Sequence, residues 1–284
     1  WEVDRVLLLL LAILIGIGLI AVAAASPAAA ERYSGGSVRV NDLFFFYRQL
    51  AWIALSIPVM IVISMMPRER AKRFSIGGAV LFLVLLAAVP FIGAEKNGAV
   101  RWIELGIGQL QPSEFLKPFF VVTIAWILSL KEKDKNLPVF LMSALPVAII
   151  ALLLMKQPDF GSTIIYGTVW IAMLSLAGLR LKVIAMLGLA ALAGIVLAYF
   201  TYDVATVRID SFLFGEGDNF QVENAMRTLT AGGMFGMGPG AGTRKFGLPE
   251  PHTDYIFSVI GEEFGLIACL AIALIYLGIV GRVL

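Results

Sequence analysis

Eight long apolar runs dominate this 284-residue sequence and restrict what it can fold into. A helix that crosses about 30 Å of hydrocarbon needs roughly 20 mostly apolar residues, because each residue adds about 1.5 Å of rise. Hydrophobic residues make up 60% of the chain and charged residues 15%, unlike an average soluble domain. The sequence therefore predicts an all-α polytopic membrane protein with about eight spans, approximately at 6–30, 44–66, 74–93, 114–130, 138–155, 163–179, 183–201 and 257–281.

Other classes of protein leave signatures that this sequence lacks. The first apolar run is longer than the roughly 7–15 residues of a cleavable signal, so we expect a retained helix. The single cysteine, Cys269, allows no internal disulfide. No zinc, Walker or Rossmann motif is present, and a net charge of +2 gives no reason to expect a nucleic-acid partner.

Basic residues are dense in the short connections on one side of the predicted bundle. These connections are 67–73, 131–135 and 180–182, and Arg5 and Arg282 lie on the same side. Short loops rich in Lys and Arg stay in the cytoplasm, so we expect this side to be cytoplasmic. By parity, the long segment 202–256 is expected on the extracytoplasmic side.

The opposite side carries cations at positions where a charge is costly. Arg48, Lys117 and Lys156 lie at or inside the ends of predicted spans. A charge there is unfavourable unless it faces the bundle interior or a polar cavity. Long outer loops that are merely solvated are the alternative explanation for such residues. A cluster of outward cations favours an anionic ligand, with phosphate as the obvious class.

The stretch AGGMFGMGPGAGTRKFGLPE, residues 231–250, is rich in glycine and also contains two adjacent basic residues and a Leu-Pro pair. Glycine permits backbone conformations and close approaches that side chains forbid. A flexible linker would not need RKFGLPEPHTD attached to it. We therefore expect a structured loop that folds over the bundle and shapes a site.

Polar residues precede and enter the last apolar run. At about 100° per residue, Asp254, Ser258, Gly261 and Gly265 are predicted to lie on one narrow stripe, a small polar face that points into the bundle. Glu262 borders this face and Glu263 lies farther round the helix, and these glutamates are expected either to pair with basic residues or to serve a function. Asp254 is suited both to cap the free amides of this helix and to act as a base.

Several stretches of the chain resemble the SEDS family (shape, elongation, division and sporulation), polytopic glycosyltransferases that polymerise peptidoglycan from lipid II. The matching stretches occur in the family's order and are FYRQL (46–50), RWIELG (101–106), QPSEFLK (111–117), QPDFGS (157–162), RIDSFL (208–213), GGMFGMGPGAGTRKFGLPEPHTDYIF (232–257) and GEEFGL (261–266). The compact GMGPGAGTRKFGLPEPHTD is more similar to the cell-division type, FtsW, than to the elongation type, RodA.

The resemblance implies a single membrane domain over residues 1–284, with a large extracytoplasmic loop at 202–256, in the bacterial inner membrane. The family has ten membrane helices, so it also implies that this chain lacks the last two. The implied reaction is attack of the 4-hydroxyl of an acceptor N-acetylglucosamine on the anomeric carbon of a donor N-acetylmuramic acid, which displaces undecaprenyl pyrophosphate. The implied partners are a class B penicillin-binding protein transpeptidase and other membrane proteins of the division machinery.

One base and several cations suffice for this reaction, because pyrophosphate leaves as a stable anion and needs no protonating acid. The resemblance makes Asp254 the catalytic base. The candidate substrate contacts are Arg48, Arg101, Glu114, Lys117, Lys156, Asp159, Arg208, Lys245 and His252.

Some of these residues have an alternative structural role. Glu114 and Lys117 are three residues apart and are expected to pair on one helix. Asp159 is expected either to cap the sixth span or to help hold a divalent cation, Mg²⁺ or Mn²⁺, although one carboxylate is a weak metal signal. His252 is expected to orient the HTD turn rather than to act as the base.

Two other functions suit a polytopic membrane protein. A transporter of the lipid-linked precursor predicts repeated halves and broken helices near the midplane of the membrane, whereas the polar residues here gather near the outer surface. A scaffold that only recruits a partner does not explain the outward cations or Asp254. We therefore expect a glycosyltransferase of the division type, with an elongation-type polymerase as the near alternative.

Overall fold

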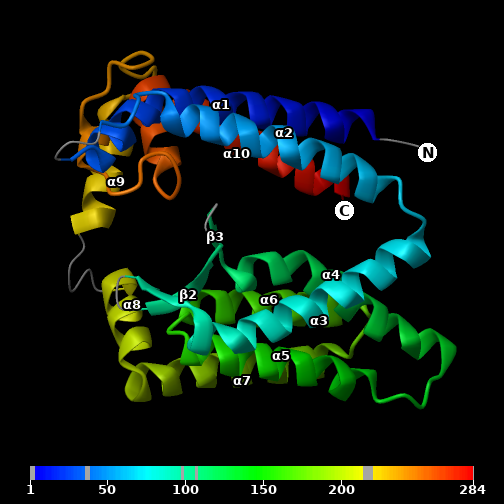
Figure 1. Cartoon of the computed structure of the whole chain (residues 1–284). Coiled ribbons are helices and arrows are strands. Elements are labelled where there is room, and N and C mark those ends of the chain that lie inside the picture. Colours follow the sequence, from blue (N-terminus) through cyan, green and yellow to red (C-terminus); the bar gives the residue numbers. More distant parts are fainter. Residues whose placement is uncertain (1–3, 36–38, 97–98, 106–107, 214–219, 284) are drawn as a thin grey trace. The chain divides into compact units, whose positions relative to one another are not determined.

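The computed structural model describes residues 4–35, 39–96, 99–105, 108–213 and 220–283, most of which are helical (Figure 1). The long apolar helices are α1 (Arg5–Tyr33), α2 (Phe44–Ser64), α3 (Arg68–Ile92), α4 (Pro112–Lys133), α5 (Val139–Lys156), α6 (Phe160–Leu176), α7 (Leu181–Thr201) and α10 (Ile256–Val283). Each coincides with one predicted span, so the predicted all-α polytopic membrane fold is confirmed.

Within the described ranges, seven of these helices are long and apolar enough to cross a membrane. The eighth, α6, has 17 residues and rises about 26 Å, slightly less than the thickness of the hydrocarbon layer. The predicted span 163–179 lies three residues later than this helix, whereas the predicted span 74–93 begins six residues after the start of α3.

The chain divides into two compact units. One unit, called here the terminal unit, comprises Trp1–Met65 and Glu216–Leu284, and the other, the central unit, comprises Met66–Gly215. Each unit has its own buried core and its own share of the candidate site residues.

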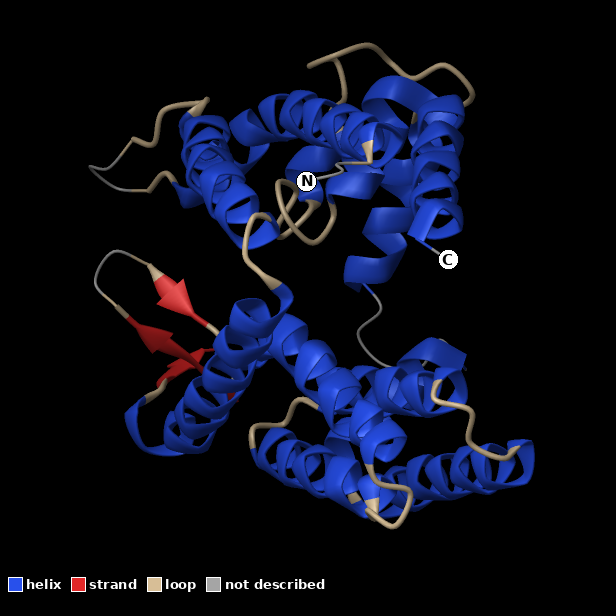
Figure 2. Cartoon of the chain, turned by 90° about the vertical axis from the view of Figure 1, so that its right-hand side faces the viewer, coloured by secondary structure: helices blue, strands red, loops and turns tan. Residues whose placement is uncertain are grey.

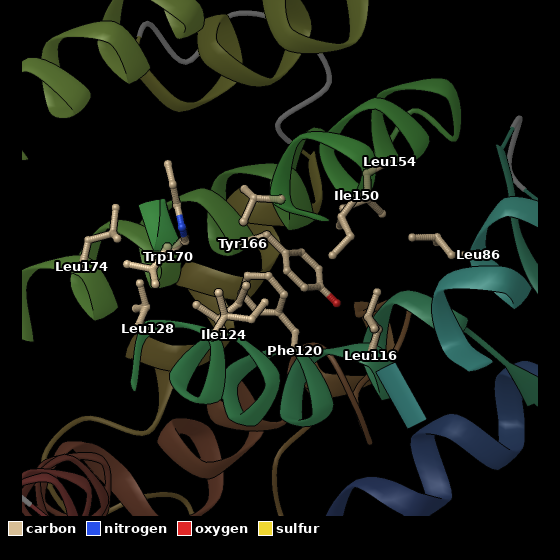
Figure 3. Close-up of a cluster of buried hydrophobic side chains, with 13 residues drawn as sticks. Leu86, Leu116, Phe120, Ile124, Leu128, Ile150, Leu154, Tyr166, Trp170 and Leu174 are labelled. Atoms are coloured by element: carbon tan, nitrogen blue, oxygen red, sulfur yellow. The ribbon is translucent and has the colours of Figure 1, made fainter. Parts of the chain in front are cut away.

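The core of the central unit forms where α3, α4, α5 and α6 pack together (Figure 3). Tyr166 of α6 lies in this core and makes an edge-to-face contact with Phe120 of α4, with ring centroids 4.9 Å apart. Its hydroxyl donates to the carbonyl oxygen of Ser113, at 2.7 Å. Because lipid is as apolar as leucine, such close packing and hydrogen bonding hold membrane helices together.

A small antiparallel sheet connects α3 to α4 in the central unit (Figure 2). Its strands are β1 (Ala94–Lys96), β2 (Ala99–Glu104) and β3 (Gln109–Leu110), and they pair in the order β1-β2-β3. Strand β2 carries Arg101. The unit ends with α8 (Asp203–Leu213), which follows α7 and packs against it.

In the terminal unit, α1 packs against both α2 and α10, and α9 (Phe220–Ala231) packs against α10. The buried face of α1 is almost entirely alanine, which lets neighbouring backbones approach closely. A short 3₁₀ helix, η1 (Arg244–Gly247), lies between α9 and α10 and contacts α1. The segment 202–256, predicted to be a structured loop, therefore contains α8, α9 and η1.

The last span is not one continuous helix. Gly265 has φ 82° and ψ 177°, far from helical values, and it breaks α10. Asp254 lies in the turn before α10 and is exposed, whereas Ser258 and Gly261 are buried. The predicted single polar face from Asp254 to Gly265 is therefore wrong, because the helix begins after Asp254 and is interrupted at Gly265.

The backbone groups freed by this break are bonded to the glycine-rich segment 232–243, called here the docked loop. The amides of Met237 and Gly238 donate to the carbonyls of Glu262 and Glu263, at 2.9 and 3.0 Å. In the opposite direction, the amide of Leu266 donates to the carbonyl of Gly233 at 2.9 Å, and the amide of Ile267 donates to the carbonyl of Met234 at 3.3 Å. Irregular backbone at membrane depth is tolerated where protein satisfies its polar groups, and the docked loop does so here.

We predict that Gly236→Ala destabilises the terminal unit. Gly236 has φ 84°, and an added Cβ would overlap the carbonyl of Glu263. The backbone strain alone costs roughly 1–3 kcal/mol, so the thermal unfolding midpoint in detergent should fall by several degrees. Gly188→Ala on α7 is the control, because an added Cβ there meets nothing within 4 Å. Equal midpoints for Gly236→Ala and wild type would contradict the docking.

Candidate active site

Asp254 is presented to solvent at the start of α10. Its side chain is exposed and makes no hydrogen bond with any residue in the described part of the chain. The amide of Ile256 donates instead to the backbone carbonyl of Thr253, at 3.3 Å. The carboxylate is therefore not used as a helix cap within the described chain, which leaves its lone pairs available to a ligand.

Residues 248–254, called here the HTD segment, are attached to the start of α2 through His252. The imidazole of His252 packs on the ring of Phe45, with centroids 4.0 Å apart. Its Nδ1 is 3.7 Å from Oε2 of Glu250. The guanidinium of the exposed Arg48 lies 5.8 Å from the centre of the same Phe45 ring. This packing fits the role expected for His252, which is to orient the turn that carries Asp254.

The HTD segment is also attached to the end of α1. The hydroxyl of Tyr33 donates to Oε1 of Glu250 at 2.6 Å, and the guanidinium of Arg32 donates to the carbonyl of Leu248 at 3.4 Å. The side chain of Leu248 is buried with Ala25 of α1 and Val259 of α10. Contacts with three helices therefore fix the residues immediately before Asp254.

Lys245 lies inside the protein, with 1% of its surface exposed. Its ammonium pairs with Glu263 and donates to the carbonyl of Ala24, at 2.9 Å for the latter. A phosphate cannot reach this enclosed group without rearrangement. Lys245 was predicted to contact substrate, but its burial gives it a structural role instead. Its pairing with Glu263 confirms, for this glutamate, the expectation that the buried glutamates pair with basic residues.

In the central unit, Arg101 holds the QPDF turn between α5 and α6. Its Nε donates to the carbonyl of Gln157 at 2.9 Å, and its guanidinium also donates to the carbonyl of Pro158. The side chain of Gln157 in turn donates to the carbonyl of Leu86 on α3, at 2.7 Å. Two nitrogens of the Arg101 guanidinium thus donate to the turn, which makes this residue a support for it.

Asp159 caps α6, since its carboxylate accepts from the amide of Ser162 at 3.1 Å. The capping alternative is confirmed. Among the described residues, no three His, Cys, Asp or Glu side chains lie close enough together to hold a metal ion. The described donors near Asp159 therefore do not form a site for the predicted Mg²⁺ or Mn²⁺ by themselves.

The remaining candidates of the central unit are more accessible. Glu114 and Lys117 pair on α4, with Nζ 2.7 Å from both carboxylate oxygens, as their spacing predicts. Half of the Glu114 side chain is exposed, so the pair adds little stability. Lys156, at the end of α5, and Arg208, on α8, are both exposed and remain candidate phosphate contacts.

The structure thus gathers Asp254, His252 and Arg48 around one segment of the terminal unit, and Arg101 and Asp159 around one turn of the central unit. The contact between His252 and Phe45 could not be predicted from the sequence, because the two residues are far apart in the chain. Glu250 and Tyr33, which hold the HTD segment, are also supporting residues that sequence reasoning missed.

Burial lowers the pKa of His252 below its ordinary value of 6.5. Arg48 lowers it further, whereas Glu250 and Asp254 act in the opposite direction. An unfolded histidine therefore takes up its proton at a higher pH than the folded one. Between the two pKa values the unfolded state holds more protons, so folding stability falls as the pH drops through 6.5.

We predict that His252→Phe removes this pH dependence. Phenylalanine keeps a ring against Phe45 but cannot take up a proton. The wild-type thermal midpoint should decrease between about pH 7.5 and pH 5.5 by more than that of the variant. Identical slopes for the two proteins would show that His252 does not titrate differently on folding.

The chain is similar to proteins of known family along its whole described length. Residues 4–284 match the sequence model of the cell cycle proteins named for FtsW, RodA and SpoVE. A probable peptidoglycan glycosyltransferase FtsW of Caulobacter vibrioides is 37% identical over 272 residues, which cover 94% of this chain and 68% of that protein. The stage V sporulation protein E of Bacillus subtilis is 34% identical over 286 residues, covering 96% and 76%.

Solved structures share the fold. A chain of a peptidoglycan synthase complex, studied for its coordination of polymerization and crosslinking, matches with a TM-score of 0.73 and 23% identity, over 99% of this chain and 77% of that one. The rod shape determining protein RodA of Thermus thermophilus matches with a TM-score of 0.63 and 22% identity, covering 98% and 73%. The chain belongs to the FtsW, RodA and SpoVE family of cell cycle proteins, the SEDS family.

Proposed function

We propose that this chain is a peptidoglycan glycosyltransferase that polymerises lipid II into glycan strands during septal cell-wall synthesis and releases undecaprenyl pyrophosphate. Family membership supports the reaction, and relatives with 33–37% identity that are named FtsW support the division type. The observation that carries the proposal is the exposed carboxylate of Asp254, which ends a segment fixed by contacts with α1, α2 and α10.

Asp254 is the proposed general base. A sugar hydroxyl is a poor nucleophile near neutral pH, and a positioned base typically accelerates such a reaction by about 10²–10⁴-fold. An exposed carboxylate with no hydrogen bond to a described residue can accept the proton of the acceptor hydroxyl. The contacts of the HTD segment restrict where that carboxylate can lie, which is the condition for an effective base.

Cations would stabilise the leaving pyrophosphate. Arg48 is an exposed cation of the terminal unit that lies near the HTD segment, through their shared contact with Phe45. Lys156 and Arg208 are exposed cations of the central unit. Charge-assisted hydrogen bonds from such groups to phosphate oxygens are shorter and stronger than neutral ones. We propose Arg48 as a phosphate contact of the terminal unit, with Lys245 as a support within that unit. Lys156 and Arg208 stay candidate phosphate contacts of the central unit, where Arg101 is a support.

A transporter is the competing function, and the break in α10 is a feature that transporters use to bind substrate. In this protein, however, four of the backbone groups at the break are hydrogen-bonded to the docked loop. They are not available to a substrate without undocking of that loop. The geometry therefore supports polymerisation better than transport.

The partner that we propose is a crosslinking enzyme, a class B penicillin-binding protein, together with other membrane proteins of the division machinery. One structural relative belongs to a peptidoglycan synthase complex that coordinates polymerization with crosslinking. The multi-pass chain would lie in the bacterial inner membrane, with Asp254 on the extracytoplasmic side, because the basic short connections favour the cytoplasm.

Cysteine labelling tests this orientation. The native Cys269 is buried, so it should give little background. We predict that a membrane-impermeant maleimide labels Glu223→Cys on α9 in intact spheroplasts, and labels Ser175→Cys near the end of α6 only after permeabilisation. The reverse pattern would place Asp254 in the cytoplasm and remove it from a reaction on exported lipid II.

Replacement of Asp254 tests the reaction. Asparagine keeps the size of the side chain but cannot accept the proton, so Asp254→Asn should slow polymerisation of lipid II by about two orders of magnitude or more. Asp254→Glu moves the carboxylate by about 1 Å and should recover only part of the rate. Glycan product is measured by gel electrophoresis after reconstitution of the full chain with its partner.

Asp203→Asn is the matched control, because Asp203 is an exposed aspartate at the start of α8, outside the HTD segment. It should polymerise at the wild-type rate. Lipid II binding and partner binding should be retained by Asp254→Asn. A folded Asp254→Asn protein with a near-normal rate would exclude Asp254 as the base.

A further inference from the structure

We propose that Lys245, Glu262 and Glu263 form a buried ionic cluster that positions Asp254 for the glycosyl transfer proposed above, on which this inference rests. Lys245 is thus a positioning residue and not a substrate contact. The cluster fixes the docked loop and the HTD segment to α10, and its loss should reduce the rate of the chemical step more than the affinity for lipid II.

All three ionisable side chains are buried. Lys245, Glu262 and Glu263 expose 1%, 0% and 1% of their surfaces. Burial of a charge is costly unless the charge is paired and fully hydrogen-bonded. A cluster with two carboxylates and one ammonium therefore requires further donors, and the structure supplies them from the backbone.

Each carboxylate is bonded to the chain that precedes the HTD segment. Oε1 of Glu262 accepts from the amide of Arg244 at 2.6 Å, and Oε2 accepts from the amide of Lys245 at 3.0 Å. Glu263 accepts from the ammonium of Lys245 and from the amide of Gly240. Bonds from two neighbouring glutamates thus fix η1 and the end of the docked loop to one turn of α10.

The cluster closes a loop that contains the proposed base. Lys245 and Glu263 are 18 residues apart in the sequence, and Asp254 lies between them. On one side, the amide of Leu248, the first residue of the HTD segment, donates to the carbonyl of Lys245 at 3.1 Å. On the other side, α10 begins at Ile256. Because both ends of the segment are fixed to the same helix, the cluster limits the movement of Asp254.

The other ion pairs of the described chain are more exposed, including Asp4 with Arg282, which joins the start of α1 to the end of α10. Glu114 with Lys117, and Glu69 with Lys72, pair within a single helix and are partly exposed. They join no separate segments, whereas Lys245 joins η1, α10 and, through the carbonyl of Ala24, α1. Loss of the ammonium would leave two buried carboxylates without a counter-ion. The docked loop and HTD segment would then shift to admit water.

Kinetics of Lys245→Met in the full chain test the proposal. Per mole of folded protein, kcat for lipid II polymerisation should fall by about 10- to 100-fold, because a displacement of about 1 Å can cost about 10² in rate. KM should stay within about twofold, because the exposed cations remain. Lys245→Arg should recover part of kcat. Lys72→Met, which removes the partly exposed pair with Glu69, is the control and should match wild type.

A second variant carries the test if Lys245→Met does not fold. Lys245→Met with Glu263→Met removes both partners of the ion pair, and such replacements by apolar residues often leave the fold intact. The double variant should also have a reduced kcat with little change in KM. A wild-type kcat in either folded variant would overturn the proposal. A loss of polymerisation activity that is fully explained by the fraction of unfolded protein would overturn it as well.

A distance measurement separates this inference from the proposed function. Spin labels on Thr253→Cys and Gln49→Cys, with Cys269→Ala, report how firmly the HTD segment is held against α2. The distance distribution should be narrow in the otherwise wild-type chain and broad with Lys245→Met. An unchanged distribution would overturn the positioning role even if lipid II is polymerised. If the wild-type chain fails to polymerise lipid II but Lys245→Met still broadens the distance distribution, only the proposed function would be overturned.

Discussion

The break in α10 sets the arrangement of the terminal unit, because backbone polar groups that leave a membrane helix must find partners within the protein. The docked loop supplies them through four backbone hydrogen bonds across Gly265. This exchange requires backbones to touch where side chains would intervene, which explains the high glycine content of residues 232–243. The loop is thus part of the helix packing, although its composition resembles that of a linker.

The same turn of α10 then connects the break to the site. Glu262 and Glu263 contribute their carbonyls to the docked loop and their carboxylates to η1 and Lys245. Backbone and side chains of two adjacent residues therefore hold the chain that leads to Asp254. Contacts from Tyr33 and Phe45 complete the support from α1 and α2. The carboxylate of Asp254 is exposed, but the segment that carries it is held by three helices. This combination suits the base that we propose for a lipid-linked substrate.

The local features of this protein could be predicted from its sequence. The eight apolar helices follow from the length of the apolar runs, and the Glu114–Lys117 pair and the Asp159 cap follow from spacing within a few residues. The break at Gly265 could not be predicted, because it depends on a loop some 30 residues earlier in the chain. The burial of Lys245 likewise depends on contacts with α1 and α10, which cannot be predicted from the residues next to Lys245 in the sequence.

The docking of the loop into α10 is tested most directly by hydrogen exchange of the amides of Met237, Gly238, Leu266 and Ile267 in the detergent-solubilised wild-type chain. Each of these amides donates a hydrogen bond across the break. They should exchange as slowly as the amide of the buried Ile272 within α10. Exchange at the rate of exposed, unbonded amides would show that the loop is not docked and that α10 and the HTD segment are held in another way.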